Sequence, residues 1–285
     1  MTLCDAKNPL EAHRPEFPVR LLLFWIRRCL LGWLLIATVI FSFQVAVCAM
    51  VHDNENVQAL LSLLKVLPSF IQNMLGGARL MGGDVVALIS IGYLHPLVLI
   101  LFMVYAVATP TGLLVGEIQQ GSMEMILGRA VSKSQVYWCA VLPTIGGMFL
   151  LTQCMFLGTV AGTSLFDFGE RIPLDGFYRL CINAGMLAIT VSTIALFVSS
   201  WCGDRTFAVT ITVTYLVFDY FLSIVSMWWP PMESFRKLSL FNYVNGPGIF
   251  RDQAWPVVEM LVLTAVSVTM IGAGWIIWTR RDLPA

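Results

Sequence analysis

The chain has 285 residues, of which 58% are hydrophobic and only 12% are charged, and its formal net charge is zero. A soluble domain carries about 25% charged residues, so this composition argues against an ordinary globular protein and favours a protein embedded in lipid. The balanced charge argues against nucleic acid as a partner. The seven cysteines form no CxxC motif or Cys/His cluster, so neither a zinc site nor a disulfide framework is predicted.

Six apolar runs are each long enough to cross a bilayer, which takes about 20 residues of helix. They predict an all-α polytopic membrane protein with one transmembrane domain over residues 1–285. The expected spans are at about 29–51, 91–115, 135–163, 180–201, 207–227 and 256–278. An even number of spans places both termini on one side, where Lys and Arg are more concentrated beside the span ends. The positive-inside rule therefore predicts cytoplasmic termini, and we expect the cytoplasmic membrane of a prokaryote.

The N-terminal region allows more than one interpretation. The sequence Ala46–Ala49 resembles a signal-peptide cleavage site, but the run 29–51 exceeds the usual apolar core of about 7–15 residues, which favours an uncleaved span. In the preceding segment 17–28, Arg20 and Arg27 share one side of a helical wheel while most other residues are apolar. This pattern predicts a short helix in the cytoplasmic interface. The alternative is a continuous extension of the first span with its arginines reaching toward water.

The loop 52–90, on the outer side, predicts an amphipathic helix. Its apolar residues between 57 and 75 recur at helical spacing, and polar residues fill the opposite face. Pro68 is expected to break or kink this helix, and Gly76–Gly77 to end it. The pattern fits a helix on the outer surface of the membrane, and it equally fits one packed on the outer ends of the spans.

The cytoplasmic connection 116–135 predicts a short helix held between two spans. We expect Ser122 to cap this helix, Glu124 to lie in its first turn, where negative charge is favoured, and Gly128 to end it. The pattern Ser132-x-x-Gln135 is typical of a capping box at the start of the third span. Such a small, rigid projection is what a soluble motor protein needs in order to grip the membrane domain. The structural alternative is an ordinary capped connection.

This connection resembles a motif of the permease subunits of type-two ABC exporters, Glu-x-x-x-Gly-Thr/Ser-x-Glu-x-Leu-Leu-x-x-Pro-Val-Ser-Arg. Ala130 and Lys133 depart from the family's usual Pro and Arg. Segments 235–243 and 278–283 are similar to the family's outer "Leu-Ser-Pro-Phe" loop and its "Phe-x-Arg-Arg-Asp-Leu" tail. The matching positions of the motif are Glu117, Gly121, Ser122, Glu124, Ile126, Leu127, Val131 and Ser132.

The resemblance implies a non-catalytic transmembrane subunit whose loop 117–132 contacts a separate nucleotide-binding ATPase. The chain has no Gly-x-x-x-x-Gly-Lys-Ser/Thr phosphate loop, so ATP and Mg are expected in that partner and no cofactor in this chain. A second permease copy, identical or not, is also implied, with the path for an unidentified substrate between the copies. Membrane components of assembly machines, such as those for the copper site of nitrous-oxide reductase, share the resemblance. The implied coupling residues are Glu117, Gly121, Ser122, Met123, Glu124, Ile126, Leu127, Arg129 and Ser132.

Three polar residues inside the spans are candidates for the path, namely Asp219, Gln153 and Asn183. Asp219 lies well inside the fifth span, where a charge is costly and usually faces protein or water. It is expected either to line the path or to be hydrogen-bonded to another segment. Gln153 and Asn183, like Gln44, also suit hydrogen bonds between helices. An intramembrane enzyme would need paired catalytic groups, and a secondary transporter often has inverted repeats; the sequence shows neither.

Overall fold

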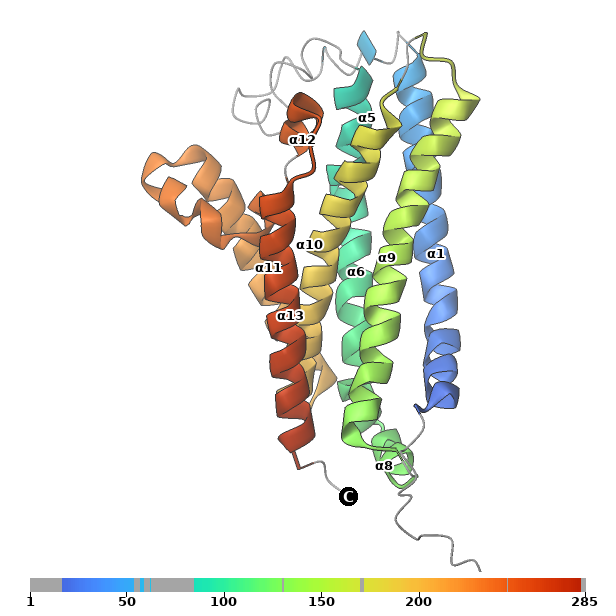
Figure 1. Ribbon diagram of the computed structural model, residues 1–285, viewed down its shortest axis with the longest axis vertical. Coiled ribbons are helices and arrows are strands. Elements are labelled where there is room, and N and C mark those ends of the chain that lie inside the picture. Colours follow the sequence, from blue (N-terminus) through green and yellow to red (C-terminus); the bar gives the residue numbers. More distant parts are fainter. Residues whose placement is uncertain are drawn as a thin grey trace, which may run out of the picture.

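The computed structural model describes residues 17–53, 57–58, 62, 85–129, 131–169, 172–244 and 246–282. Within these ranges the chain is all-α, and six helical segments are long and apolar enough to cross a membrane. The spans stand roughly parallel in an upright bundle (Figure 1). The predicted polytopic membrane protein with six spans is therefore confirmed.

The observed helices extend beyond most of the predicted span limits. The six spans are α1 (Val19–His52), α5 with α6 (Val85–Leu94 and Pro96–Leu113), α9 (Lys133–Leu165), α10 (Leu174–Trp201), α11 (Arg205–Trp228) and α13 (Val257–Arg280). Two short helices, α7 (Val115–Gln119) and α8 (Ser122–Leu127), connect α6 to α9. The 3-10 helices η1 (Pro230–Leu238) and η2 (Leu240–Tyr243) and the helix α12 (Gly246–Asp252) connect α11 to α13.

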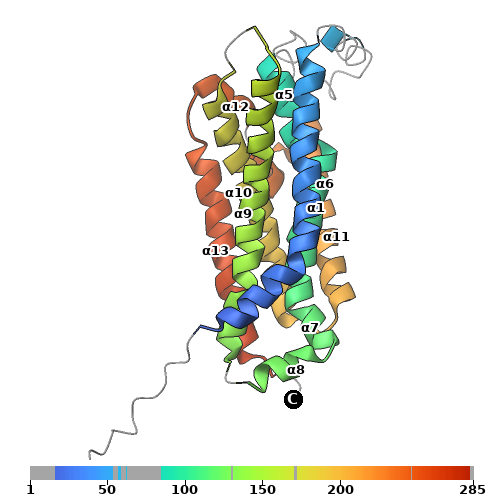
Figure 2. The ribbon, with the colours of Figure 1, turned by 90° about the vertical axis from the view of Figure 1, so that its right-hand side faces the viewer.

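The segment 17–28, for which a short interfacial helix was expected, forms the first turns of α1. The helix is unbroken from Val19 to His52, and Figure 2 shows its first turns running at an angle across the lower end of the bundle. The segment is therefore joined to the first span without a break, and its position in the cytoplasmic interface stays a prediction. The amphipathic helix predicted at 57–75, with Pro68 and Gly76–Gly77, lies almost entirely outside the described residues.

Helix α10 is the central span of the bundle, since it packs against α6, α9, α11 and α13 and is buried along most of its length. Its buried hydroxyls mostly bond to carbonyls of the same helix, as Ser192 does to Ala188. Thr190 also reaches α13, where its Oγ1 lies 3.2 Å from the Leu263 carbonyl and 3.0 Å from Ser267 Oγ. Small hydroxyl residues therefore allow close packing of α10 without leaving buried polar groups unpaired.

Helices α1 and α9 approach closely at Gly158 and Gly162, which form a Gly-x-x-x-Gly pattern on α9. A Cβ atom at Gly158 would lie 2.8 Å from the Phe41 carbonyl oxygen, and one at Gly162 would lie 2.6 Å from Cys48 Sγ. In lipid, helices associate through packing rather than through exclusion of water, so missing side chains let the two backbones approach. The residue spacing on α9 thus determines where α1 can pack.

We expect Gly158→Ala to destabilise the protein by about 1–3 kcal/mol, because the new methyl group meets backbone on α1 that cannot move aside. Gly146→Ala is the matched control on the same helix, since nothing lies within 4 Å of its added Cβ. Alanine also favours helix over glycine by roughly 0.5–1 kcal/mol, so the control should be neutral or stabilising. Unfolding of the purified protein in detergent measures both changes. Equal stabilities for the two variants would contradict the proposed contact.

Candidate functional site

The candidate site lies at the end of the bundle where α7 and α8 turn the chain from α6 back into α9 (Figure 2). Gly121 separates the two short helices with a φ of 72°, in the left-handed region that glycine adopts without strain. Glycine at this position thus permits the sharp turn by which α8 folds beneath α7. We call this part of the molecule the α7–α8 end.

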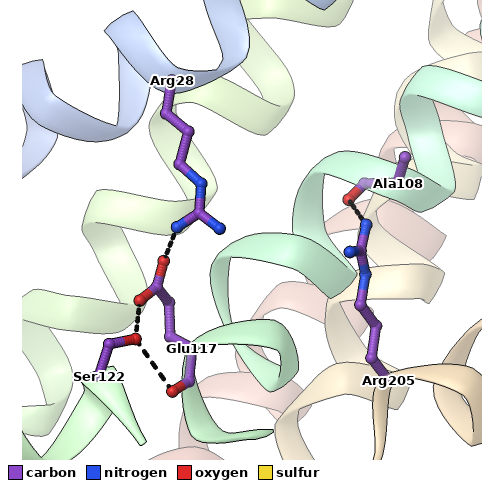
Figure 3. A network of polar contacts seen from close by, with 5 residues as sticks. All are labelled: Arg28, Ala108, Glu117, Ser122 and Arg205. Atoms are coloured by element: carbon purple, nitrogen blue, oxygen red, sulfur yellow. Dashed lines mark hydrogen bonds and ion pairs between the residues drawn. The ribbon is translucent and has the colours of Figure 1, made fainter. Parts of the chain in front are cut away.

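Glu117 of α7 is the buried centre of a polar network at this end (Figure 3). Arg28, from the first turns of α1, donates from Nη1 to Oε1 of the carboxylate and forms an ion pair with it. The Ser122 hydroxyl donates to Oε2 and lies 3.1 Å from the Glu117 carbonyl oxygen. Both carboxylate oxygens are thus satisfied, one from α1 and one from α8. This removes most of the penalty for burying the charge.

The role predicted for Ser122 is wrong in one respect. Gly121 occupies the N-cap position, and Ser122 is the first residue of α8, with its side chain turned back toward Glu117. The Ser122 hydroxyl donates its proton to the buried carboxylate, and hydrogen bonds to a charged acceptor are roughly twice as strong as those between neutral groups. Glu124 does lie in the first turn and Gly128 does end the helix, as predicted.

The predicted capping box at the start of α9 is confirmed. Ser132 Oγ accepts a hydrogen bond from the Gln135 N–H at 3.2 Å, and Gln135 Oε1 accepts one from the Ser132 N–H at 2.9 Å. The next residue, Lys133, donates from Nζ to the Arg281 carbonyl at 2.6 Å, beyond the end of α13. The exit from the α7–α8 end is thus held in place by both local and distant hydrogen bonds.

Helix α8 has a buried face and an exposed face. Met123 is buried in an apolar cluster with Trp25 of α1 and Tyr137 of α9. On the opposite side Met125 is 71% exposed, beside the exposed Glu124 and Arg129. Ile126 and Leu127, also among the predicted coupling residues, are partly buried against the same cluster. Any contact with a partner therefore starts from the side of Met125, while Met123 supports α8 from within.

Met125 is the residue of this site that the sequence analysis missed. It lies two positions from Met123, and two positions of a helix turn through about 200°, so the two methionines point in nearly opposite directions. Sequence spacing therefore indicated that one of them would be exposed. Only the packing of α8 on α1 and α9 decides which one.

A second contact joins the α7–α8 end to α11. The backbone N–H of Arg205, the first residue of α11, donates to Gln119 Oε1 at 3.3 Å. The Arg205 guanidinium lies over α6, with Nη2 3.5 Å from the Ala108 carbonyl oxygen (Figure 3). Helices α1, α9 and α11 thus all have hydrogen-bonded or capped connections to the same short segment.

The three polar residues predicted inside the spans are not brought together. Asp219 is buried, and both its carboxylate oxygens accept from the Leu240 N–H, at 3.2 and 3.1 Å, at the start of η2. Asn183 of α10 donates to the Tyr243 carbonyl, at the end of η2, at 3.0 Å. Two of the three residues therefore fasten η2 to the spans. Gln153 lies 3.4 Å from the hydroxyl of its neighbour Thr152 on the same helix.

The chain was compared with protein-family models, curated proteins and solved structures, and none of them matches it. In the part of the chain that the structure describes, no group of three or more His, Cys, Asp or Glu residues could hold a metal ion.

We expect Arg28→Ala to lower the stability of the α7–α8 end by about 1–3 kcal/mol, because it leaves the Glu117 carboxylate buried without its cation. Arg27→Ala is the control, since it removes the same charge from the neighbouring exposed position. Unfolding in detergent gives the global effect, and hydrogen exchange of residues 115–128 gives the local one. The double variant Arg28→Ala/Glu117→Gln should lose less stability than the sum of the losses in the two single variants. Full additivity would mean that the two side chains do not interact.

Proposed function

We propose that the chain is the membrane-spanning permease subunit of an ATP-binding cassette transporter, driven by a separate ATPase chain that docks on α8. The observation that carries this proposal is the geometry of α8, a short helix held firmly at one end of the bundle with a mixed apolar and charged face exposed. The resemblance of residues 117–132 to the permease motif of type-two ABC exporters supports the same conclusion.

The polar network suits the transmission of force from a partner to the spans. A partner pushing on α8 would act on α1 through the Glu117–Arg28 ion pair and on α11 through the Gln119–Arg205 hydrogen bond. It would act on α9 through the capped start of that helix at Ser132. Charge-assisted and reciprocal hydrogen bonds resist deformation more than single neutral ones. Helices α1 and α9 would therefore tilt before their connections to this end gave way.

The exposed face of α8 has the character of a protein-docking surface. Met125 offers a flexible apolar side chain that fits irregular pockets. Glu124 and Arg129 place charges of both signs around it, and an apolar anchor within a polar rim is the usual arrangement at the centre of an interface. Met125 is therefore the proposed anchor, and the two charged residues would determine which partner fits.

The proposal also assigns the sides of the membrane. An ATPase requires the α7–α8 end to face the cytoplasm, and the first turns of α1 and the last of α13 lie at that same end (Figure 2). Both ends of the transmembrane domain would then be cytoplasmic, in the cytoplasmic membrane of a prokaryote. A second permease copy would complete the path for the substrate, and the ATPase would bind ATP and Mg.

The docking face can be tested with a photo-reactive amino acid in place of Met125, crosslinked in native membranes. We expect an adduct with a chain that carries a Gly-x-x-x-x-Gly-Lys-Ser/Thr phosphate loop, identified by mass spectrometry. The same label at Phe235, which is exposed on η1, is the control and should not capture that chain. Capture of no ATPase from position 125, or equal capture from both positions, would reject the proposal.

Coupling can be tested separately by Glu124→Arg, which reverses a charge on the exposed face without touching the Glu117 network. We expect the variant to insert and fold normally but to co-purify with about tenfold less ATP-hydrolysing activity, since a reversed charge at an interface costs on the order of 1–2 kcal/mol. Arg280→Glu, which reverses an exposed charge at the end of α13, is the control. Unchanged ATPase activity with Glu124→Arg would show that α8 does not couple the two proteins.

A further inference from the structure

A groove runs between α6 and α11, and we propose that it binds one anionic phospholipid, with the phosphate at Arg205 and an acyl chain along the two spans. This inference does not rest on the proposed function, because it concerns a different surface and needs no ATPase. Figure 2 shows the two helices next to each other on the side of the bundle away from α13.

The groove has a volume of about 880 Å³ and is lined almost entirely by apolar side chains. Because both walls are membrane spans, the groove opens toward the hydrocarbon of the bilayer rather than toward water. Its walls are formed by Leu99, Met103 and Val107 of α6 and by Val209, Val213 and Leu216 of α11. A long apolar chain is therefore the ligand that these walls fit.

Among the described residues, Arg205 is the single charged residue that lines the groove, and it lies at one end of the groove as the first residue of α11. Tyr220 and Phe241 lie at the other end, about 22 Å away along the helix at 1.5 Å per residue. The groove therefore combines a cationic end with a long apolar channel. This is the complement of a lipid that has an anionic head and an acyl tail.

The Arg205 side chain has donors to spare for a phosphate. Its guanidinium has five N–H donors, and the structure gives it one long contact, from Nη2 to the Ala108 carbonyl at 3.5 Å. In the described part of the chain no carboxylate forms an ion pair with it. The neighbouring Asp204 uses its carboxylate to cap α11, accepting from the Phe207 N–H at 2.8 Å.

A phospholipid fits this groove better than a helix from a second copy of the chain. A helix laid into the groove would cover Arg205 with apolar contacts and leave its charge without an anion, which is strongly unfavourable. A phosphate instead meets the planar guanidinium with two parallel hydrogen bonds. Basic residues between spans at the membrane surface recognise anionic headgroups in this way.

Native mass spectrometry of the full chain, released from nanodiscs of phosphatidylcholine doped with phosphatidylglycerol, tests the headgroup contact. We expect the wild type to retain phosphatidylglycerol in preference to phosphatidylcholine. Arg205→Gln should lower that retention about fivefold, the contribution of one basic residue near an anionic headgroup, and Arg205→Lys should restore part of it. Arg280→Gln removes an exposed arginine from the same end but outside the groove, and should have no effect. Equal effects of Arg205→Gln and Arg280→Gln would overturn the proposal.

A second pair of variants tests the acyl-chain channel. Val213→Trp fills the groove and should lower retention of both lipids, whereas Val268→Trp, on the exposed surface of α13, should not.

Glycerol phosphate, a headgroup without chains, should not compete with the lipid for the groove. Effective competition would show that the site binds a free anion and would overturn the proposal. Efficient disulfide crosslinking between two copies that carry Val217→Cys would place a second copy in the groove and would also overturn the proposal.

Discussion

One buried carboxylate, that of Glu117, organises the end of the bundle at which the chain has its clearest functional motif. A charged group out of water is tolerated only if it is paired and hydrogen-bonded. Glu117 obtains its partners from two directions, the first turns of α1 and the first residue of α8. The first turns of α1 and the start of α8 are therefore held in position relative to each other by the same carboxylate. The same network holds the short connection between α6 and α9 in one position, as the proposed docking role requires.

Elsewhere in the bundle, close packing replaces the hydrophobic effect as the force between helices. Lipid tails are as apolar as leucine, so spans gain little by hiding apolar surface from them. The contacts that specify this bundle are accordingly the glycines of α9 against α1 and the hydroxyls of α10 against α13. Many large apolar residues of α1 and α13, such as Leu31 and Val258, are exposed, as expected for surfaces that face lipid. Helix α10 can be central because it carries small and hydroxyl-bearing residues over most of its length.

The two charged residues of α11, Arg205 and Asp219, have different consequences, because their surroundings differ. The carboxylate oxygens of Asp219 accept hydrogen bonds from the backbone of η2. Asp219 therefore fastens η2, part of the segment between α11 and α13, to α11. Arg205 is exposed beside an apolar groove, where its donors remain available to a ligand. The depth of a charged side chain in a span thus indicates the energetic cost of placing it there. The partners of that side chain determine whether it stabilises the fold or stays available to a ligand.

The sequence by itself determined the features that depend on neighbouring residues. The spans follow from the length and hydropathy of each run, and the capping box at Ser132 and Gln135 follows from a spacing of three residues. The acidic first turn of α8 and its end at Gly128 are local in the same sense. For that reason these predictions needed no knowledge of the rest of the fold.

Only the tertiary structure decided the contacts between residues far apart in the chain. Arg28 and Glu117 are 89 residues apart, and no local pattern pairs them. Glu117 also accepts a hydrogen bond from Ser122, which lies one residue beyond the N-cap position expected of it. The packing of α8 on α1 and α9 decided that Met123 is buried and Met125 exposed, and the segment at 240–243 decided the role of Asp219. Helix periodicity shows which residues share a face, but the direction of that face depends on the neighbours that the whole chain assembles around it.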